Sequence, residues 1–325
     1  MARVVTRRFS MDVECDTAAE FLQVLDPISG LFHERSLVYR GVRSDGFDLT
    51  PSAHRSVSEH SAGAVLLNSW RYVTGPQPTD HEQCIAELYT IAKFFQIVDR
   101  RGLRLPEDSY QLRLKLDEWK RKLSANNVGE YIWPPPEFYS LIALAQHHRV
   151  PTRALDWTWD PLVAAYFAAQ DAVLDPPERL VVWVFDYEVR EINPSSPIVT
   201  FTVSGADNAN LQAQRGLFML HSQSVATPAS PFVPQSYDRV LFRAVEDVSP
   251  PRLFTRILLP TVEARCLRSV LASVGVSAGR IYPGLAGAAM EYHEEFELRD
   301  EPPYVDRVPS MERLRTRYYA AIGKT

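Results

Sequence analysis

The densest group of chemically functional side chains lies between Gln146 and Phe167, in the segment QHHRVPTRALDWTWDPLVAAYF. Asp160 followed by Pro161 predicts the start of a helix, because aspartate caps free amide groups and proline fits the first turn. Residues 152–158 are then expected to form the strand or turn that enters this helix. Because a helix N-terminus can hold an oxygen of a phosphate or a ribose, the segment is a candidate ligand site.

The alternative for this segment is structural. Arg153 and Asp156 can form an internal ion pair, in which case Asp160 is only a helix cap. The adjacent His147 and His148 could be zinc ligands, but the pattern disfavours it, because neighbouring side chains on a helix point about 100° apart and no third ligand follows at a suitable spacing. We therefore expect no metal here, and we rank hydrolysis by the two histidines last.

A second group is Tyr39-Arg40-Gly41, at the end of an apolar stretch that predicts a short strand. An arginine offers a planar fork for a phosphate or a carboxylate. Gly41 permits a ligand to approach the backbone closely, and Arg55 adds a second cation nearby in the sequence. The alternative for this group is an ordinary exit from a strand into a turn.

The usual cofactor motifs are absent from the sequence. It contains no Walker loop, no GxGxxG and no HExxH. A nucleotide or catalytic site therefore has to be argued from the two groups above.

Composition indicates an ordinary globular protein of 325 residues, 46% hydrophobic and 23% charged, with a formal net charge of −5. The mild acidity argues against a protein that binds nucleic acid over its whole surface, although a local basic patch stays possible. The first residues lack the apolar region of a signal peptide, and no stretch reaches the roughly 18 apolar residues of a membrane helix. The three cysteines are far apart and odd in number, which suggests neither a disulfide framework nor a zinc knuckle. We expect a cytoplasmic location and no membrane contact.

Hydrophobic spacing predicts the elements that position these groups. Strands are expected at residues 37–41, 180–186, 198–203, 216–220 and 253–259. Helices are expected at residues 81–101, 110–124, 138–148, 262–274 and 311–322. Residues 45–75 are expected to be mostly loop. Helices come mainly first and strands mainly later, which favours an α+β fold in which a helical N-terminal half packs on a mixed, mainly antiparallel β-core.

The chain resembles the FRG domain family, which is named for a Phe-Arg-Gly motif that stands here as Tyr39-Arg40-Gly41. The most specific part of the likeness is the string QHxxxPTRxLDWTxxP, which runs from Gln146 to Pro161. The pattern continues through residues 214–218, 257–260 and 281–283. The resemblance implies a single domain over residues 20–292, with a helical insertion at about 56–135 and a tail helix within 293–325.

The layout is also similar, though less closely, to that of mono-ADP-ribosyltransferases with an Arg, Ser-Thr-Ser and Glu signature. In those enzymes an arginine on the first strand contacts NAD, and a later strand enters a helix that reads A..FA. Residues 37–41 look like the first of these elements, and residues 156–158 followed by 164–168 look like the second. The likeness implies a split sheet, NAD as substrate and an unknown macromolecular acceptor.

The same likeness implies roles for particular residues. Breaking the bond between nicotinamide and ribose develops oxocarbenium character, which a site must stabilise by its charges and dipoles. The residues that would act in catalysis are Arg40, Thr158, Gln214 and Glu87. The residues that would hold the nucleotide are Tyr39, Arg40, Gly41, Arg55, Gln146, His147, Arg153, Asp156, Trp157 and Tyr166.

The sequence departs from the transferases at their catalytic glutamate. The corresponding residues, 253–256, read Leu-Phe-Thr-Arg and contain no carboxylate. Gln214, Glu87 and Glu246 are candidate replacements, but Glu87 can equally be a solvated helix residue or a partner for Arg40. Two functions stay open. One is an NAD-dependent ADP-ribosyltransferase-like effector, a toxin or defence protein in bacterial or phage conflict. The other is a non-catalytic module that binds a nucleotide or a protein.

Overall fold

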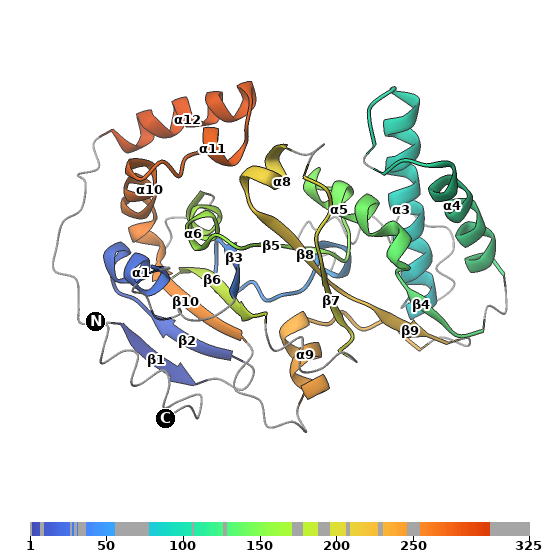
Figure 1. Cartoon of the computed structure of the whole chain (residues 1–325). Helices are drawn as coiled ribbons and strands as arrows, with labels where there is room; N and C mark the ends of the chain where they lie inside the picture. The colour runs from blue at the N-terminus through green and yellow to red at the C-terminus, as the bar shows by residue number, and fades with distance from the viewer. Residues whose placement is uncertain are drawn as a thin grey trace.

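The computed structural model describes residues 2–6, 10–26, 28, 31, 37–55, 78–105, 107–125, 129–170, 178–187, 196–205, 209–226, 230–245 and 254–299. The predicted helix at 311–322, the predicted loop residues 56–75 and Glu246 lie outside these ranges. The fold is α+β with a mainly antiparallel sheet, as predicted (Figure 1).

The main sheet contains eight strands among the described residues, in the order β1-β2-β10-β6-β3-β5-β8-β7. Their bounds are β1 Arg3–Thr6, β2 Ser10–Glu14, β3 Leu37–Val42, β5 Leu155–Thr158, β6 Arg179–Asp186, β7 Ile198–Phe201, β8 Gly216–His221 and β10 Phe254–Pro260. Neighbouring strands pair antiparallel, except that β10 pairs with β2 in parallel. The five predicted strands are confirmed.

Strands β1 and β2 were not predicted from the sequence. Residues 10–14 read Ser-Met-Asp-Val-Glu, a short alternation of polar and apolar residues that fits a strand with one face in water, not one buried on both faces. Asp12 is nevertheless fully buried, because its carboxylate accepts two hydrogen bonds from Arg256 on the neighbouring strand β10, at 2.9 and 2.7 Å. The strand can be buried on this face because the charge of Asp12 is paired with that of Arg256.

The sheet divides between β3 and β5. Strand β3 pairs with β6 from Leu37 to Val42, and β5 pairs with β8 along its whole length. Between β3 and β5, by contrast, Tyr39 opposite Thr158 is the single paired position. Two well-paired halves therefore meet at one residue pair, which leaves the strand ends beyond it free to line an opening.

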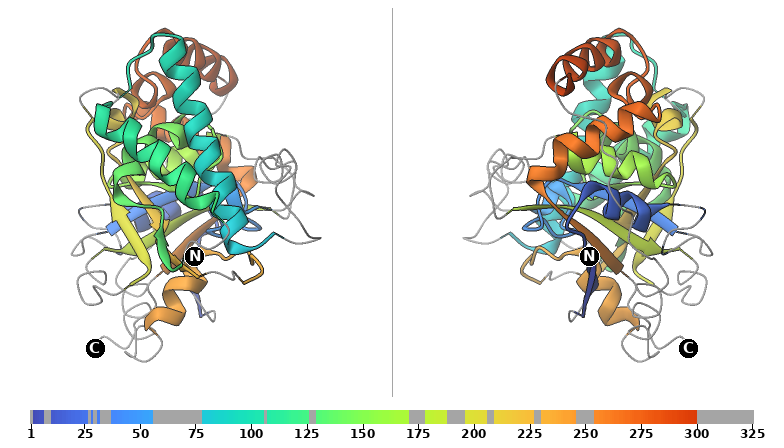
Figure 2. Two further views of the ribbon diagram at one scale, coloured as in Figure 1. Left: turned by 90° about the vertical axis from the view of Figure 1, so that its right-hand side faces the viewer. Right: turned by 90° about the vertical axis from the view of Figure 1, so that its left-hand side faces the viewer.

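One face of the sheet packs against α1 (Ala18–Leu25), α6 (Pro161–Gln170) and α10 (Ala264–Ser273), which Figure 2 shows from the side. Helix α6 begins where the sequence predicts, because Asp160 Oδ1 accepts a hydrogen bond from the Leu162 amide at 3.0 Å. The opposite face packs against α9 (Tyr237–Val245) through apolar side chains that include Tyr237, Val240 and Leu241.

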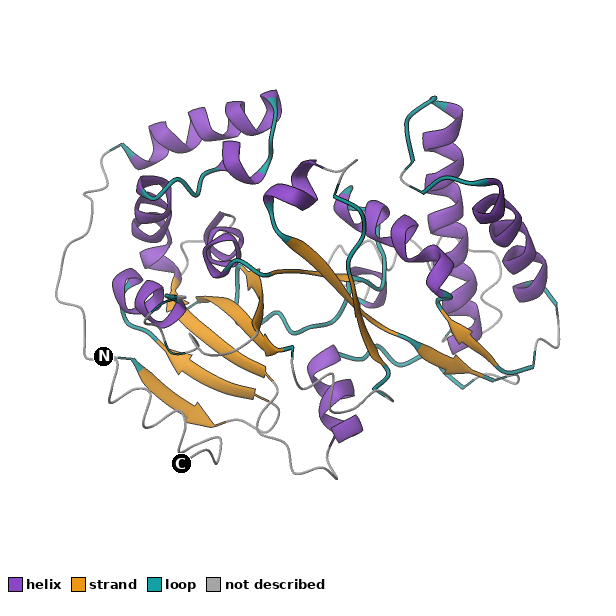
Figure 3. Ribbon diagram, viewed as in Figure 1, coloured by secondary structure: helices purple, strands orange, loops and turns teal. Residues whose placement is uncertain are grey.

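A helical lobe lies beside the sheet, as Figure 3 shows, and its helices share a cluster of buried apolar side chains. It consists of α3 (Asp80–Arg100), α4 (Tyr110–Leu123), η3 (Pro136–Phe138), α5 (Tyr139–His147) and the two-stranded ribbon of β4 (Tyr131–Trp133) and β9 (Gln223–Val225). The predicted helices at 81–101, 110–124 and 138–148 are confirmed as α3, α4 and α5.

Four short elements and one longer helix, α12, complete the described part of the chain. They are η1 (Ser52–His54), α8 (Ala209–Ala213), η5 (Thr261–Glu263), α11 (Ala278–Ile281) and α12 (Leu285–Leu298). The predicted helix at 262–274 is confirmed as η5 followed by α10. Within the described ranges, no helix combines the length and the apolar character needed to cross a membrane.

Gly41 is the point where helix α6 comes closest to the sheet. A Cβ atom on Gly41 would lie 2.0 Å from the carbonyl oxygen of Ala164 and 2.6 Å from the amide nitrogen of Ala168. No side chain fits at such distances. The absent side chain of Gly41 thus makes room for a helix backbone, and the expectation that a ligand also approaches Gly41 stays a prediction.

We expect the substitution Gly41→Ala to lower the free energy of unfolding by about 1–3 kcal/mol, because the added methyl group forces α6 away from the sheet. Urea unfolding followed by circular dichroism measures the effect. Gly46→Ala is the matched control, since its nearest neighbour would be Ser44 Oγ at 3.5 Å. We expect it to change stability by less than about 0.5 kcal/mol. Equal effects of the two substitutions would contradict this explanation of Gly41.

Candidate functional site

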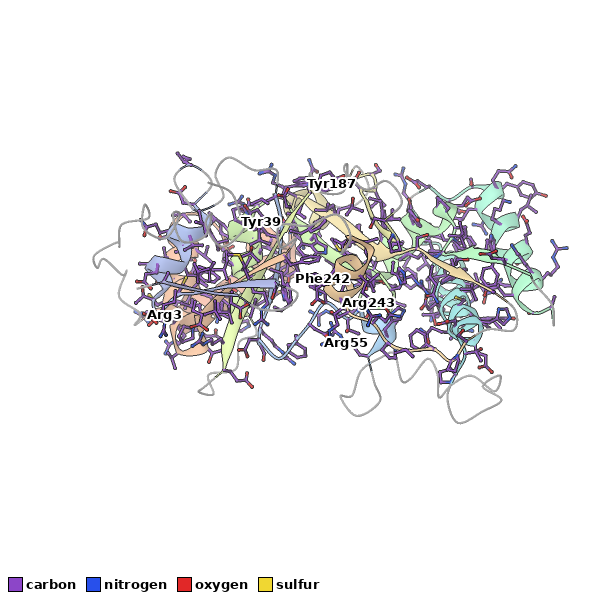
Figure 4. All side chains as sticks on the ribbon, turned by 90° about the horizontal axis from the view of Figure 1, so that it is seen from below. Arg3, Tyr39, Arg55, Tyr187, Phe242 and Arg243 are labelled. Carbon is purple, nitrogen blue, oxygen red and sulfur yellow. The ribbon has the colours of Figure 1, made fainter. Side chains whose placement is uncertain are left out.

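A cleft of about 510 Å³ opens where β3 and β5 diverge. Ten of the residues predicted for the site line it, namely Tyr39, Arg40, Gly41, Arg55, Gln146, His147, Asp156, Trp157, Thr158 and Gln214. Ser52, Arg149, Val150, Phe167, Gln170 and Tyr282 complete the lining. Figure 4 labels Tyr39 and Arg55 among the side chains, with the molecule seen from below. The fold thus brings the two groups singled out in the sequence into one cavity.

Arg40 spans the gap between the two diverging strands. Its Nη1 atom donates a hydrogen bond of 2.6 Å to the main-chain carbonyl oxygen of Asp156, and the Asp156 carboxylate lies 3.7 Å away. Only 15% of the Arg40 side chain is exposed. Burial lowers the pKa of Arg40, and Asp156 opposes that effect. An arginine stays protonated at neutral pH, so a mostly buried cation faces the cleft.

Asp156 is held by residues at the end of α5 and in the turn before β5. Gln146 Nε2 donates to Asp156 Oδ2 at 2.9 Å, and Gln146 Oε1 accepts from the Thr152 hydroxyl at 2.8 Å. Ser52 in turn exchanges hydrogen bonds with the main chain of Thr152, each of 3.2 Å. This chain of contacts fixes the Asp156 carboxylate although 51% of its side chain is exposed.

Positive charge outweighs negative charge among the described residues of the lining. Arg40, Arg55 and Arg149 contribute three guanidinium groups, whereas Asp156 contributes the one carboxylate. This excess of positive charge suits the cleft to an anionic ligand.

The backbone of Arg149 has a φ angle of 61°, a left-handed conformation that favours glycine at a helix C-terminus.

An aromatic pair that sequence reasoning missed closes one side of the cleft. The rings of Phe167 and Tyr282 meet edge to face, with centroids 6.2 Å apart and planes at 81°. The Tyr282 hydroxyl donates to Gln170 Oε1 at 3.1 Å, which fixes the ring against α6. Trp157, predicted to help hold the nucleotide, lines the cleft but is almost fully buried, in the core on the α9 side of the sheet.

Thr158 and Gln214 link the two halves of the site. The Thr158 hydroxyl donates to the main-chain oxygen of Gln214 at 2.6 Å and accepts from the Asp160 amide at 2.9 Å. Gln214 Nε2 donates to the Ile281 carbonyl at 3.2 Å. Because its proton is used within the protein, the Thr158 hydroxyl can offer a ligand only an acceptor oxygen.

His147 lines the cleft, whereas His148 is exposed. His147 Nε2 lies 3.0 Å from the side-chain amide of Asn210, which donates to it. Burial lowers the pKa of His147, so the imidazole is neutral at pH 7. In the part of the chain that the structure describes, no three side chains of metal-ligating type come together.

Three predicted site residues lie outside the cleft. Arg153 is 1% exposed and forms a bidentate pair with Glu87, with Nε to Oε2 at 2.6 Å and Nη2 to Oε1 at 3.1 Å. The two alternatives expected from the sequence, an Arg153–Asp156 ion pair and a Glu87–Arg40 contact, are both wrong. Arg153 and Glu87 instead form an ion pair with each other in the interior. Tyr166 is also buried, and its hydroxyl donates to Glu294 at 2.6 Å.

Glu87 is saturated by further donors inside the protein. Trp133 Nε1 donates to Oε2 at 2.8 Å, while Gln83 Nε2 and His54 Nε2 reach Oε1 at 2.9 and 3.1 Å. Burial alone would raise the pKa of Glu87, but Arg153 and the hydrogen bond from His54 outweigh it and hold that pKa far below its usual range. This buried cluster of Glu87, Arg153, His54, Gln83 and Trp133 joins the helical lobe to the start of β5 and to η1.

Residues 35–175 match the family model of the FRG domain. The chain contains an FRG domain. The match includes the Tyr39-Arg40-Gly41 group and the whole string from Gln146 to Pro161, but it ends before Gln214 and Tyr282. The cleft of this FRG domain is thus completed by residues beyond the matched range. Among curated proteins and solved structures, none matches the chain.

We expect Glu87→Ala to lower the free energy of unfolding by about 3–5 kcal/mol, because it leaves the Arg153 guanidinium buried without a counter-charge. Chemical denaturation of the purified variant measures the loss. The control is Glu118→Ala, which breaks an exposed pair with Lys115 and should have little effect because solvent screens it. A loss no larger than that of the control would show that the buried cluster does not support the fold.

Acid should lower the free energy of unfolding of the FRG domain by protonating the Glu87 carboxylate. Since the pKa of folded Glu87 is lowered, its contribution is complete above the unfolded value of about 4.3 and is lost as the pH falls towards the folded value. We therefore expect the free energy of unfolding to drop more steeply between about pH 5 and pH 3 in wild type than in Glu87→Gln. Denaturant titrations over this range test the slope, and parallel curves would contradict the assignment.

Proposed function

We propose that the cleft of this FRG domain binds NAD or a related nucleotide, and that the protein is an ADP-ribosyltransferase-like enzyme. The observation that carries the proposal is the position of Arg40, a mostly buried cation at the point where the sheet divides, inside the cleft that Asp156 and Thr158 also line. The cellular role that fits such an activity is that of an effector in bacterial or phage conflict, with a macromolecule as the acceptor.

The charges of the cleft support a dinucleotide. A diphosphate carries negative oxygens that match the guanidinium groups of Arg40, Arg55 and Arg149. Arg55 is oriented by a hydrogen bond of 3.1 Å from its Nε atom to the Thr50 carbonyl. The volume of about 510 Å³ falls within the range usual for sites that bind small molecules and cofactors.

The aromatic and amide groups of the cleft support a nucleoside end. Phe167 and Tyr282 line the cleft, where a flat heterocycle can pack against an aromatic ring. Gln214 and the oxygen of Thr158 lie on the same wall, where they can meet ribose hydroxyls. These groups come from β5, α6, the turn before β8 and the residues after α11, so the ligand would bridge both halves of the sheet.

A specific observation favours a second candidate, a module that binds the nucleotide without turnover. Glu87, one of the expected replacements for the transferase glutamate, is enclosed in the buried cluster. Gln214, the other replacement in the described residues, is neutral and would stabilise positive charge on the ribose less than a carboxylate does. Binding and turnover must therefore be measured separately.

We expect the purified protein to release nicotinamide from NAD and to lose that activity in Arg40→Ala, because a diphosphate loses its buried cation. Release is followed by chromatography, and NAD binding by the shift in melting temperature. Arg121→Ala is the matched control, because this exposed arginine lies on α4 and not in the cleft. It should behave as wild type.

The outcomes separate the candidates. Release that is lost only in Arg40→Ala supports the enzyme. Protection by NAD without release, again lost only in Arg40→Ala, supports the binding module. No release and no protection would contradict both, while equal losses in the two arginine variants would point to charge in general and not to the cleft.

A further inference from the structure

We infer that Asp156 supplies the carboxylate that stabilises positive charge on the ribose, and that Gln146 is the residue that positions it. This assignment rests on the proposed function of the cleft. It places the negative charge on β5, next to Arg40, and not before the last strand, where residues 253–256 carry no carboxylate.

Asp156 is the one carboxylate among the described residues that line the cleft. Half of its side chain is exposed, unlike that of the buried Glu87. Arg40 forms an ion pair with it through Oδ2, at 3.7 Å from Nη1, and the same Nη1 atom bonds to the Asp156 main-chain oxygen at 2.6 Å. Oδ1 takes no part in this pair. The carboxylate therefore keeps its capacity to interact with a ligand.

Other carboxylates near the cleft are engaged elsewhere. Glu294 accepts the Tyr166 hydroxyl at 2.6 Å and the Ala278 amide at 3.0 Å. Asp160 caps helix α6 through the Leu162 amide and lies 3.3 Å from Arg280. Neither lines the cleft, so both are bound in roles that hold helices in place.

Gln146 determines where the Asp156 carboxylate points. Its amide nitrogen donates to Asp156 Oδ2 at 2.9 Å, and the Thr152 hydroxyl fixes the amide orientation by donating to the Gln146 oxygen at 2.8 Å. With Oδ2 held in this way, Oδ1 is left for the ligand. A carboxylate fixed before the ligand arrives needs no rearrangement in the transition state, which is the condition under which charge stabilisation is most effective.

The chemical step balances with water or an acceptor hydroxyl as nucleophile. The bond between ribose C1′ and the nicotinamide nitrogen breaks, and its electron pair leaves with nicotinamide. Asp156 faces the positive charge that develops on C1′. The nucleophile then forms the new bond to C1′, and its proton passes to solvent directly or through Asp156. No oxidant, reductant or metal is required.

The test separates turnover from binding. We expect Asp156→Asn to reduce nicotinamide release by about 100-fold or more, which is the size of effect seen when one stabilising group is removed from a site. The melting-temperature shift caused by NAD should stay within about twofold of wild type, because asparagine keeps the Gln146 contact and the main-chain oxygen. Asp156→Glu should recover part of the rate.

Two further variants sharpen the result. Gln146→Ala should lower kcat by about tenfold while KM changes little, since a positioning residue acts on the transition state more than on binding. Glu118→Gln, which removes an exposed carboxylate on α4, should match wild type.

The two proposals fail in different ways. If wild type neither binds nor cleaves NAD, the proposed function is wrong. If wild type cleaves NAD but Asp156→Asn cleaves it at a similar rate, the proposed function stands and the role of Asp156 is wrong. NAD binding without cleavage in wild type also overturns the role of Asp156, because the carboxylate then stabilises no reaction.

Discussion

The buried pair of Arg153 and Glu87 is the constraint on which the site depends. A guanidinium that is 1% exposed must have its charge met inside the protein, because solvent cannot do so. Glu87 on α3 meets it, and His54, Gln83 and Trp133 complete the cluster. Because Arg153 precedes β5 and His54 precedes Arg55, the same pair fixes both the strand that carries Asp156 and the loop that brings Arg55 to the cleft.

A second constraint explains why Gly41 and the small residues of α6 occur together. The helix backbone lies so close to β3 that a Cβ on Gly41 would fall 2.0 Å from the Ala164 oxygen. Alanine at positions 164 and 168 permits this approach, and the tight contact sets the wall from which Phe167 faces the cleft. The motif residues Arg40 and Gly41 thus have different purposes. Arg40 provides charge to the cleft, and Gly41 provides space for the helix behind it.

Much of the fold could be predicted from the sequence, because helix caps and hydrophobic periodicity are local properties. The start of α6 at Asp160-Pro161 and the helices α3, α4 and α5 follow from them, and most predicted site residues do line one cleft. The burial of the polar face of strand β2 could not be predicted in this way. Its buried Asp12 is acceptable only because Arg256, more than 240 residues later, pairs with it.

The sequence by itself determined the element types, the FRG string from Gln146 to Pro161 and the presence of several cations and carboxylates near each other in the chain. Only the tertiary structure decided which of them pair. It took Glu87 and Arg153 into the interior, left Asp156 in the cleft, and brought Phe167 against Tyr282. The physical reason is that charge pairing and ring contact depend on distances across the fold, and residues far apart in sequence have no local signal for them.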